Sequence, residues 1–499
     1  MQPQKAVTGS FLGYNVTETM KTKPSFQLNA KKLTGLLLGP GLFALCIFLI
    51  PKDLFSYEAR AAAGTLCWMG AWWVMMPIPV GVTGFLPIII NALFHLMNMD
   101  TLLGKYATDT IFLLIGADLL TISWKVTGLD RRIALRFLYL SGPSLTSQVL
   151  MWFLIATAFA MFLPNLVVCS MLTPIAFSML RYVGEDDLKN GVIAPIILCA
   201  VAWGSGLGGM ATPFSGAMNL VAIGYIEELI GQEFMYTAWS IRMIPVLLIV
   251  TLANVGCLLL IRPKNADLKG SREYYKKLYS ELPKMSRDET VALCMFVFTV
   301  VMTFARNAYA SILPGLKPAY LFLTMGVLTF ILPKASDGLP FNNWKDASKE
   351  IGWGLLIYVA GGIALGAMLI DTGAVDSLAS IISSLNLTGG FLTMLIFTAF
   401  AVILSEISNH SSAAAICLPI VISVCKGLAI NPMPYIYTLI AAYNTAFMMP
   451  TAVRAIPVGM GLSPSYLMKR GALMTFVSII VIAVTGFVFM QIWPAFSLY

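Results

Sequence analysis

Two polar residues interrupt long apolar stretches at equivalent places in the two halves of the chain. Asn165 lies within AFAMFLPNLVVCSMLTPIAFSML, and His410 lies 245 residues later within AFAVILSEISNHSSAAAICLPIVIS. Three further matches share this offset, namely Thr127-Gly128 with Thr372-Gly373, Pro174-Ile175 with Pro419-Ile420, and Ser178 with Ser423. Such a doubled interruption is typical of a binding site between two repeats of a membrane transporter. The spacing therefore predicts a duplicated membrane protein that moves a solute.

The elements that carry these residues must lie in lipid. Apolar residues make up 58% of the chain and charged residues 11%, with a mean hydropathy of +0.82. One soluble core cannot hide so much apolar surface. Apolar segments of roughly 17 to 25 residues recur, and each is long enough to cross a bilayer as a helix. We predict an all-α integral membrane protein of the cell membrane, in contact with the lipid bilayer and with about 11 transmembrane helices.

Several apolar segments are too short to span a membrane and are broken by proline and polar residues. Irregular backbone at membrane depth is tolerated only where protein encloses it, so we predict two re-entrant hairpins with tips at 163–165 and 408–410. The stretch 130–138, DRRIALRFL, interleaves basic and apolar residues as an interfacial helix does, whereas its counterpart at 374–382 has no basic residue. This asymmetry predicts that the two repeats are inverted.

The basic residues gather beside the apolar segments. The net charge is +8, and the strongest cluster runs from Arg262 to Arg287, as in cytoplasmic flanks and unlike a nucleic-acid footprint. We divide the chain into a cytoplasmic N-terminal segment (1–32), a first transmembrane repeat (33–262), a cytoplasmic basic loop (263–287) and a second transmembrane repeat (288–499). The uncharged tail QIWPAFSLY is expected outside the cell. Eight cysteines show no CxxC pair, and no structural metal is predicted.

Four stretches of the chain resemble the divalent anion sodium symporter family, whose members carry di- and tricarboxylates or sulfate. They are DTIFLLIGADLLTISWKVTGLDRRIAL from Asp109, GGMATPFSGAMNLVAIGYIEEL from Gly208, WGLLIYVAGGIALGAMLIDTGAVDSL from Trp353, and AAYNTAFMMPTAVRAIPVG from Ala441. The resemblance covers about residues 33 to 495. It implies a small organic anion as substrate, a sodium ion as the only cofactor to expect, and a homodimer.

The binding signature of this family is only partly kept. Where the family has two Ser-Asn-Thr tips, this chain has Pro-Asn-Leu at 164–166 and Asn-His-Ser at 409–411. A Gly-Thr-Pro-Pro-Asn run appears as Ser-Gly-Ala-Met-Asn at 215–219, and its partner in the second repeat is Ala-Val-Arg-Ala-Ile at 452–456. Asn165 and Asn219 are the residues kept unchanged in these four places.

The resemblance implies a set of site residues at the matching positions. The implied substrate-binding residues are Asn165, Gly216, Asn409, His410, Ser411 and Arg454. The implied cation-binding residues are Asn165, Ser215, Ser405 and Ala452. Half-helices that end at the tips would direct positive dipole ends at an anion. Because His410 offers nitrogen, which is a poor sodium ligand, we expect the second cation site to be weakened or lost.

Two residues leave alternatives open. Because a histidine can titrate near neutral pH, His410 could carry a proton where a relative carries sodium. Alternatively, it donates fixed hydrogen bonds to a carboxylate or to the hairpin backbone. Arg454 cannot deprotonate. It either pairs with a substrate carboxylate and replaces the charge of a lost cation, or it forms a permanent ion pair with Glu406 or Asp118.

The function predicted from these features is secondary active transport of organic anions, most of all dicarboxylates. It would use alternating access, in which a repeat-derived core shifts like an elevator against a scaffold, with reduced sodium coupling. The alternative is a proton-coupled carrier or anion exchanger that uses His410 and Arg454. An integral membrane enzyme is disfavoured, because the chain has no HExxH motif, no GxSxG motif and no aspartates paired for Mg-diphosphate.

Overall fold

The computed structural model describes residues 30–139, 142–188, 191–263, 268, 270–374, 376–377 and 389–498. Within these ranges the regular elements are helices. An isolated antiparallel β-bridge also pairs Pro333 with Pro340. Seven of the described helices are long and apolar enough to cross a membrane, and five apolar helical stretches are shorter. The all-α membrane class is confirmed, whereas the number of about 11 spans stays a prediction.

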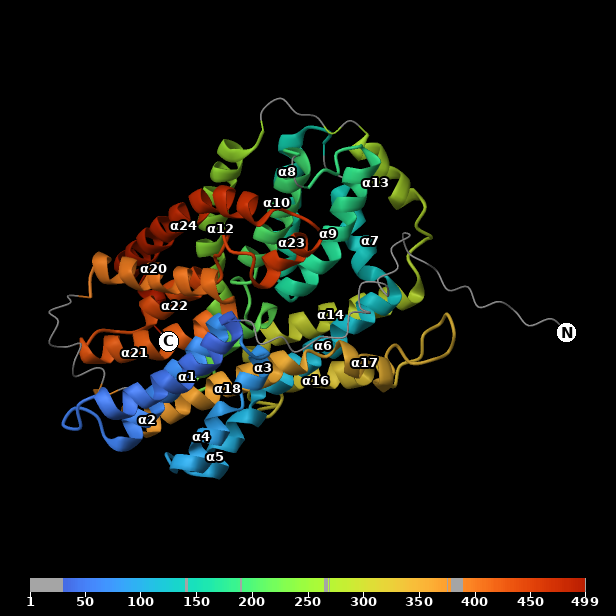
Figure 1. Ribbon diagram of the computed structural model, residues 1–499. Coiled ribbons are helices and arrows are strands. Elements are labelled where there is room, and N and C mark those ends of the chain that lie inside the picture. Colours follow the sequence, from blue (N-terminus) through green and yellow to red (C-terminus); the bar gives the residue numbers. More distant parts are fainter. Residues whose placement is uncertain are drawn as a thin grey trace.

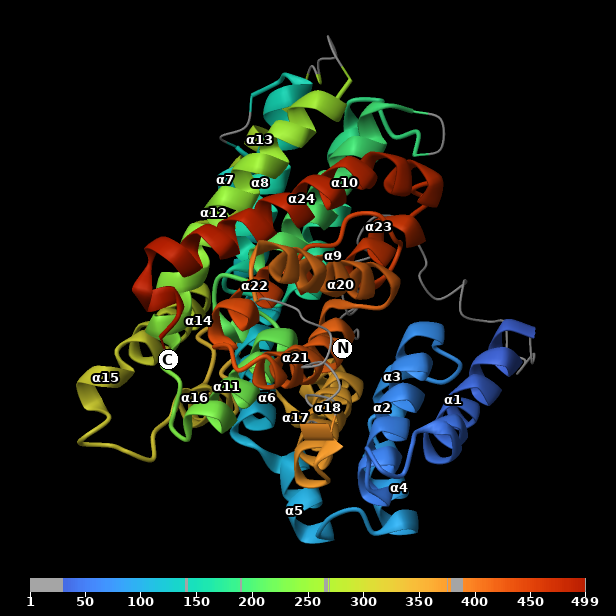
Figure 2. The same cartoon turned by 90° about the vertical axis from the view of Figure 1, so that its left-hand side faces the viewer.

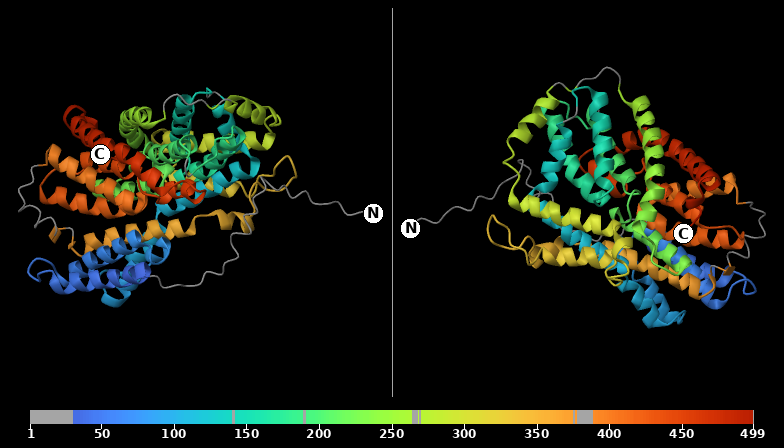
Figure 3. Two further views of the ribbon diagram at one scale, coloured as in Figure 1. Left: turned by 45° about the horizontal axis from the view of Figure 1, so that its top comes forward. Right: turned by 180° about the vertical axis from the view of Figure 1, so that it is seen from behind.

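The first half of the chain leads from peripheral helices into a hairpin and a broken helix. Its helices are α1 (Ala30–Leu49), α2 (Tyr57–Met75), α3 (Val80–Thr83), α4 (Leu86–Phe94), α5 (Met99–Gly104), the 3-10 turn η1 (Lys105–Ala107), α6 (Asp109–Thr127), α7 (Leu129–Leu138), α8 (Leu145–Ala160), α9 (Asn165–Tyr182), α10 (Ile193–Gly208), the 3-10 turn η2 (Pro213–Ser215), α11 (Ala217–Ile230) and α12 (Tyr236–Ile261). Helices α1 and α2 pack side by side at one edge of the molecule (Figures 2 and 3).

The second half repeats this order. Its helices are α13 (Ser271–Ser280), α14 (Arg287–Phe304), α15 (Arg306–Tyr309), α16 (Pro318–Leu328), α17 (Trp344–Glu350), α18 (Trp353–Asp371), α20 (Phe391–Ile407), α21 (His410–Gly427), α22 (Met433–Tyr443), the 3-10 turn η3 (Ala452–Arg454), α23 (Ala455–Gly459), α24 (Pro464–Ile492) and the 3-10 turn η4 (Pro494–Phe496). In each half a long helix (α6 or α18) is followed by a hairpin, a helix broken by a 3-10 turn, and another long helix (α12 or α24).

The two hairpins follow the 245-residue offset closely. Helices α9 and α21 have 18 residues each, begin at Asn165 and His410, and contain Pro174 and Pro419 at the same position. Figure 1 shows α8 and α9 entering the centre from the top and α20 and α21 entering it from the left. The hairpins predicted from the spacing are therefore present, and they approach the centre from different sides.

The basic segment at 263–287, predicted as a loop, contains a packed helix. Tyr275 of α13 is fully buried, and its hydroxyl donates a hydrogen bond to Oε1 of Gln148 on α8 at 3.2 Å. The sequence analysis did not foresee this helix, whose aromatic residues in SREYYKKLYS give it an apolar face. The amphipathic helix predicted at 130–138 is α7, and most of its counterpart at 374–382 lies outside the described residues.

Candidate functional site

The two hairpin tips lie on either side of one residue of α10. The amide nitrogen of Asn165 donates to the carbonyl of Gly206 at 3.3 Å. A β-carbon built on Gly206 would lie 3.4 Å from Cε1 of His410. Both tip side chains are buried, with 8% and 5% of their surface exposed. The residues that the sequence pairs at a distance of 245 positions therefore meet around a single glycine.

Four glycines in α10 and directly after it lie on two faces of this helix, one against α8 and one toward the hairpin tips. Gly204 and Gly208 pack on α8, where added β-carbons would lie 2.2 Å and 2.1 Å from the carbonyl oxygens of Phe153 and Thr157. Gly206 and Gly209 instead face the tips, since a β-carbon on Gly209 would lie 2.6 Å from Oδ1 of Asn165. Small residues thus let the first hairpin pack closely and leave room beside the site.

The second tip is built by its own local hydrogen bonds. Asn409 is the N-cap of α21, and its Oδ1 accepts a hydrogen bond from the backbone N–H of Ser412 at 2.9 Å. The hydroxyl of Ser408 donates to the carbonyl of Leu404 at 2.6 Å. Ser411 follows in the first turn and is buried. Asn409, which was predicted to bind the substrate, therefore uses its side-chain oxygen to cap the start of α21.

Arg454 is fully buried and binds the unwound segment between α22 and η3. Its Nε donates to the carbonyl of Met449 at 2.7 Å, and its Nη1 donates to the carbonyl of Ala446 at 2.8 Å. Its Nη2 donates to the hydroxyl of Thr451 at 2.9 Å. The guanidinium is thus surrounded by oxygen atoms from a segment that has left the helical conformation.

Glu406 of α20 holds the same segment from the opposite side. Its carboxylate accepts hydrogen bonds from three consecutive backbone N–H groups, those of Phe447, Met448 and Met449, at 2.6 to 3.0 Å. It also accepts a 2.7 Å hydrogen bond from the hydroxyl of Thr475. Its Oε2 lies 3.8 Å from Nη2 of Arg454. The carboxylate is therefore a brace for the unwound segment and an ionic partner of Arg454.

His410 faces this guanidinium. Its Nε2 lies 3.5 Å from Nη1 of Arg454. Because a guanidinium only donates, this contact requires a lone pair on Nε2 and hence a neutral ring with its proton on Nδ1. A second proton would place another positive charge directly beside a fixed one.

The residues implied for cation binding mostly support the backbone. The hydroxyl of Ser215 donates to the carbonyls of Gly209 and Thr212, and the hydroxyl of Ser405 donates to the carbonyl of Tyr443 at 2.7 Å. Ala452 has a φ of 47°, and its carbonyl accepts a hydrogen bond from the backbone N–H of the residue after Arg454. A left-handed alanine is costly and marks a segment held in shape by its surroundings.

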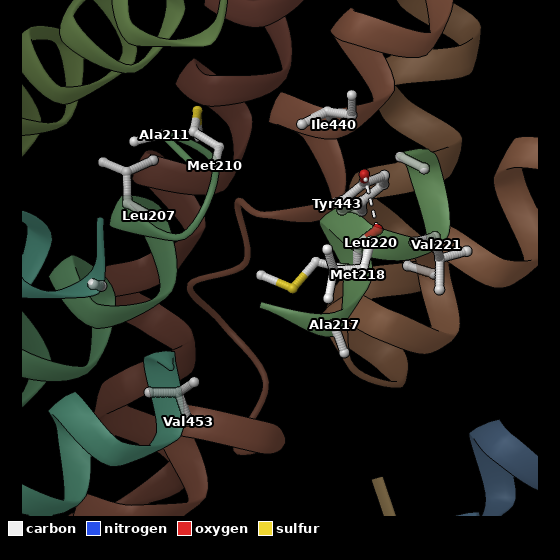
Figure 4. Close-up of a cluster of buried hydrophobic side chains, with 14 of the residues drawn as sticks. Leu207, Met210, Ala211, Ala217, Met218, Leu220, Val221, Ile440, Tyr443 and Val453 are labelled. Atoms are coloured by element: carbon white, nitrogen blue, oxygen red, sulfur yellow. Dashed lines mark hydrogen bonds between the residues drawn. The ribbon is translucent and has the colours of Figure 1, made fainter. Parts of the chain in front are cut away.

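Gly216 and its neighbours shape the other broken helix. Gly216 is the N-cap of α11 in an extended conformation, and a β-carbon there would lie 2.4 Å from the side chain of Met218. The hydroxyl of Tyr443 donates to the carbonyl of Met218 at 3.3 Å, as the dashed line in Figure 4 marks. Figure 4 also shows Val453 among the apolar side chains around the two broken helices, and Sγ of Cys169 on α9 lies 3.5 Å from its carbonyl.

Asp118 lies apart from Arg454. Its Oδ2 accepts a hydrogen bond from the backbone N–H of Gly352 at 3.1 Å, and Lys125 is paired with Glu350 at 2.6 Å. Asp118 lines a cavity of about 460 Å³ together with the first turn of α9. Of the two ionic partners considered for Arg454, the structure forms the pair with Glu406 and not the pair with Asp118, because α6 holds Asp118 at this cavity.

Asn444 belongs to the site but escaped the sequence prediction. It is fully buried where α22 ends, and its amide nitrogen donates to Oδ1 of Asn219 at 3.2 Å and to the carbonyl of Ile440 at 2.8 Å. The signal that could have found it is a polar residue inside the apolar run AAYNTAFMMP. Asn444 lies within the stretch from Ala441 that carries the family resemblance, but outside the two tips and the two short runs that were compared with the family's binding signature.

Hairpins and broken helices that meet in the protein interior, in a chain with several helices able to span a bilayer, define a polytopic membrane transporter. A profile of the family described as "Citrate transporter" matches residues 71–442 and 347–497. The chain belongs to this family. The predicted relationship to the divalent anion sodium symporters is confirmed, and the protein is a multi-pass secondary transporter and not an enzyme.

Similar proteins come from staphylococci. The sodium-dependent dicarboxylate transporter SdcS of Staphylococcus saprophyticus is 27% identical over 480 residues, which cover 92% of each chain. SdcS of Staphylococcus aureus is 27% identical over 510 residues, which cover 98% of this chain and 96% of the relative. Among solved structures, the YdaH transporter of Alcanivorax borkumensis matches 79% of this chain and 88% of its own, with a TM-score of 0.49 and 12% identity.

Proposed function

We propose that the protein transports a small dicarboxylate and couples this transport to sodium at the first hairpin tip only. The observation that carries the proposal is the convergence around Gly206. Helices α9 and α21 begin at Asn165 and His410, and the guanidinium of Arg454 lies 3.5 Å from Nε2 of His410. Helix N-termini and a guanidinium attract carboxylates. The names of the staphylococcal relatives support the substrate class.

The first tip fits a sodium ion. Oδ1 of Asn165 is buried and has no hydrogen-bond partner in the structure. A buried amide oxygen without a partner is costly, and it is an oxygen ligand of the kind that sodium takes in transporters. Asn165 therefore supports sodium binding at this tip.

The second tip does not fit a sodium ion in the same way. His410 offers a ring nitrogen, and the oxygens of Ala446, Met449 and Thr451 already surround the guanidinium of Arg454. These are the kinds of oxygen ligand that a sodium ion would use. We propose that Arg454 supplies the positive charge of a cation here, so that one coupled ion fewer accompanies the substrate.

The proposed movement is a shift of the hairpins and broken helices against α6, α14, α16 and α18. Helices α6, α14 and α16 pack on one another, whereas α8 packs on α10 and α20 packs on α22 and α24. Two cavities separate the first hairpin from the neighbouring helices. One, of about 540 Å³, is apolar and lies between α8 and α14, and the other is the cavity of Asp118. Such loosely filled boundaries are suited to sliding.

Proton coupling through His410 is the weaker alternative. Its contact with Arg454 requires a neutral ring, and protonation would oppose two positive charges. The proposal also includes a cytoplasmic N-terminus, an external C-terminus and a homodimer. Accessibility of cysteines introduced near the termini, and the mass of the purified protein in detergent, test these features.

Uptake into proteoliposomes tests the proposed function. Labelled succinate, malate, citrate and sulfate are offered while sodium and proton gradients are imposed separately. We expect uptake of dicarboxylates against a gradient, with a first-order dependence on sodium and no response to a proton gradient alone. A steep multi-ion response to sodium would contradict the role of Arg454, and absence of dicarboxylate uptake would overturn the substrate class.

A further inference from the structure

Two of the unpartnered amide oxygens of this protein converge on one point. Among the described residues, four buried asparagines have an Oδ1 without a hydrogen-bond partner, namely Asn165, Asn254, Asn342 and Asn444. A β-carbon built on Gly209 would lie 2.6 Å from Oδ1 of Asn165 and 3.0 Å from Oδ1 of Asn444. The two oxygens therefore lie close to one point beside Gly209, where the amide of Asn165, whose Nδ2 lies 2.7 Å from the same point, occupies the space that a side chain would need.

The hydrogen-bond network fixes which atom of Asn444 faces this space. Nδ2 of Asn219 lies 2.6 Å from the carbonyl of Gly209 and 2.9 Å from the carbonyl of Thr212, so Oδ1 of Asn219 must face Asn444. Nδ2 of Asn444 donates to this oxygen and to the carbonyl of Ile440. Two acceptors thus hold the nitrogen of Asn444, and its oxygen is the atom that lies near Gly209.

Two neighbouring buried oxygens without a donor require a compensating positive group. Bringing two carbonyl-type dipoles together in a buried site is unfavourable unless a donor or a cation compensates them. The ends of α10 at Gly208 and of α22 at Tyr443 also meet here, and helix C-termini carry partial negative charge. Half-helix C-termini of this kind hold sodium in transporters. Because both ligands are neutral amides, the site suits a monovalent ion.

We infer that Asn444 is a ligand of the sodium ion at the first tip and that it binds the ion together with Asn165. This inference rests on the proposed function. It adds Asn444, from the second half of the chain, to a cation site whose predicted ligands, Asn165 and Ser215, both lie in the first half. The ion then connects the start of α9 to the end of α22. Its binding orders the first hairpin and the second broken helix together.

Sodium-dependent thermal stability of the purified full-length protein in detergent tests the inference without a transport assay. The melting temperature is measured against sodium chloride at constant ionic strength, with choline as the replacement ion. Asn165→Ala and Asn444→Ala are each expected to raise the half-maximal sodium concentration at least about tenfold, and the double variant is expected to lose little more than either alone. Asn254→Ala is the matched control, because its amide is equally buried, donates to Val250 and Ser478, and has an unpartnered Oδ1 away from Gly209.

Each outcome separates the inference from the proposed function. Loss of the sodium response in Asn165→Ala and in Asn444→Ala, with a normal response in Asn254→Ala, supports the inference. A normal sodium response in Asn444→Ala, with a lost response in Asn165→Ala, overturns the role of Asn444 and leaves the first-tip site intact. If sodium does not stabilise the unaltered protein, the sodium site itself is excluded, and a water molecule would occupy the space. Should Asn444→Ala fail to fold, Asn444→Ser, whose hydroxyl is too short to reach the ion, must show the same loss.

Discussion

Oε2 of Glu406 and Nη2 of Arg454 lie 3.8 Å apart, and both side chains form hydrogen bonds with the same stretch of backbone. The carboxylate accepts from the N–H groups of residues 447–449, and the guanidinium donates to the carbonyls of Ala446 and Met449. Charged partners make hydrogen bonds stronger than neutral ones do. The two side chains thus supply partners for five backbone groups of an unwound segment in the protein interior, where water is not there to do so.

Glu406→Gln is expected to destabilise the protein. The amide keeps one acceptor but turns a donor toward backbone N–H groups, and it leaves Arg454 without its carboxylate. Loss of a buried charged partner costs on the order of 3 kcal/mol. The melting temperature in detergent should fall by several degrees. Glu350→Gln, which removes an exposed ion pair with Lys125, is the control and should leave it unchanged. Equal melting temperatures for the Glu406→Gln and Glu350→Gln variants would contradict the stabilising role of Glu406.

Arg454→Lys is expected to fail although it keeps the charge. A single ammonium group cannot reach the carbonyls of Ala446 and Met449 and the hydroxyl of Thr451 with the geometry of a guanidinium. We expect dicarboxylate uptake to fall at least about tenfold, which corresponds to 1.4 kcal/mol or more. Uptake equal to that of the unaltered protein would mean that charge alone matters at this position.

His410→Asn combined with Arg454→Pro is expected to restore a second sodium response. The asparagine returns an amide oxygen to the second tip, and removal of the guanidinium frees the surrounding oxygens for an ion. Uptake measured against sodium concentration should become steeper than first order, whereas His410→Asn alone should not change the order. A first-order response in a folded double variant would refute the idea that Arg454 takes the place of a cation.

Gly208→Ala is expected to disrupt the packing of the first hairpin. The added methyl group would lie 2.1 Å from the carbonyl oxygen of Thr157, so α8 and α10 must move apart. We expect a destabilisation of about 1–3 kcal/mol and a loss of uptake. Gly256→Ala is the control, since the same change in α12 meets no atom within 4 Å. It should be neutral or stabilising by about 0.4–1 kcal/mol.

Much of the fold follows from the sequence because membrane helices carry strong signals. The 245-residue offset predicted hairpin tips at 163–165 and 408–410, and α9 and α21 begin at Asn165 and His410. The prediction was possible because a polar residue stands out in apolar surroundings. The basic and apolar alternation at 130–138 likewise predicted α7. Helix α13 was missed because its charged residues outweighed the apolar face around Tyr275.

The site was harder to predict because its contacts join distant segments. The sequence pointed to Arg454 as unusual, but it could not choose between Glu406 and Asp118 as its partner, since both are acidic residues near membrane depth. The rotation of α10 about its axis decides which of its four glycines pack on α8 and which face the site. The same rotation decides that Asn165 and Asn444 both lie near Gly209. A lone asparagine in an apolar run does not reveal which residue it faces.

The proposed replacement of a cation by the guanidinium of Arg454 would limit how far the protein can concentrate its substrate. A sodium ion that enters with the substrate and leaves inside the cell releases its share of the ion gradient and of the membrane potential, roughly 2.3 kcal/mol per charge for each 100 mV. In the proposed cycle Arg454 remains part of the protein and returns with it when no substrate is bound. A carrier with a permanent charge in place of an ion therefore spends less of the gradient on each substrate molecule and reaches a lower limit of accumulation.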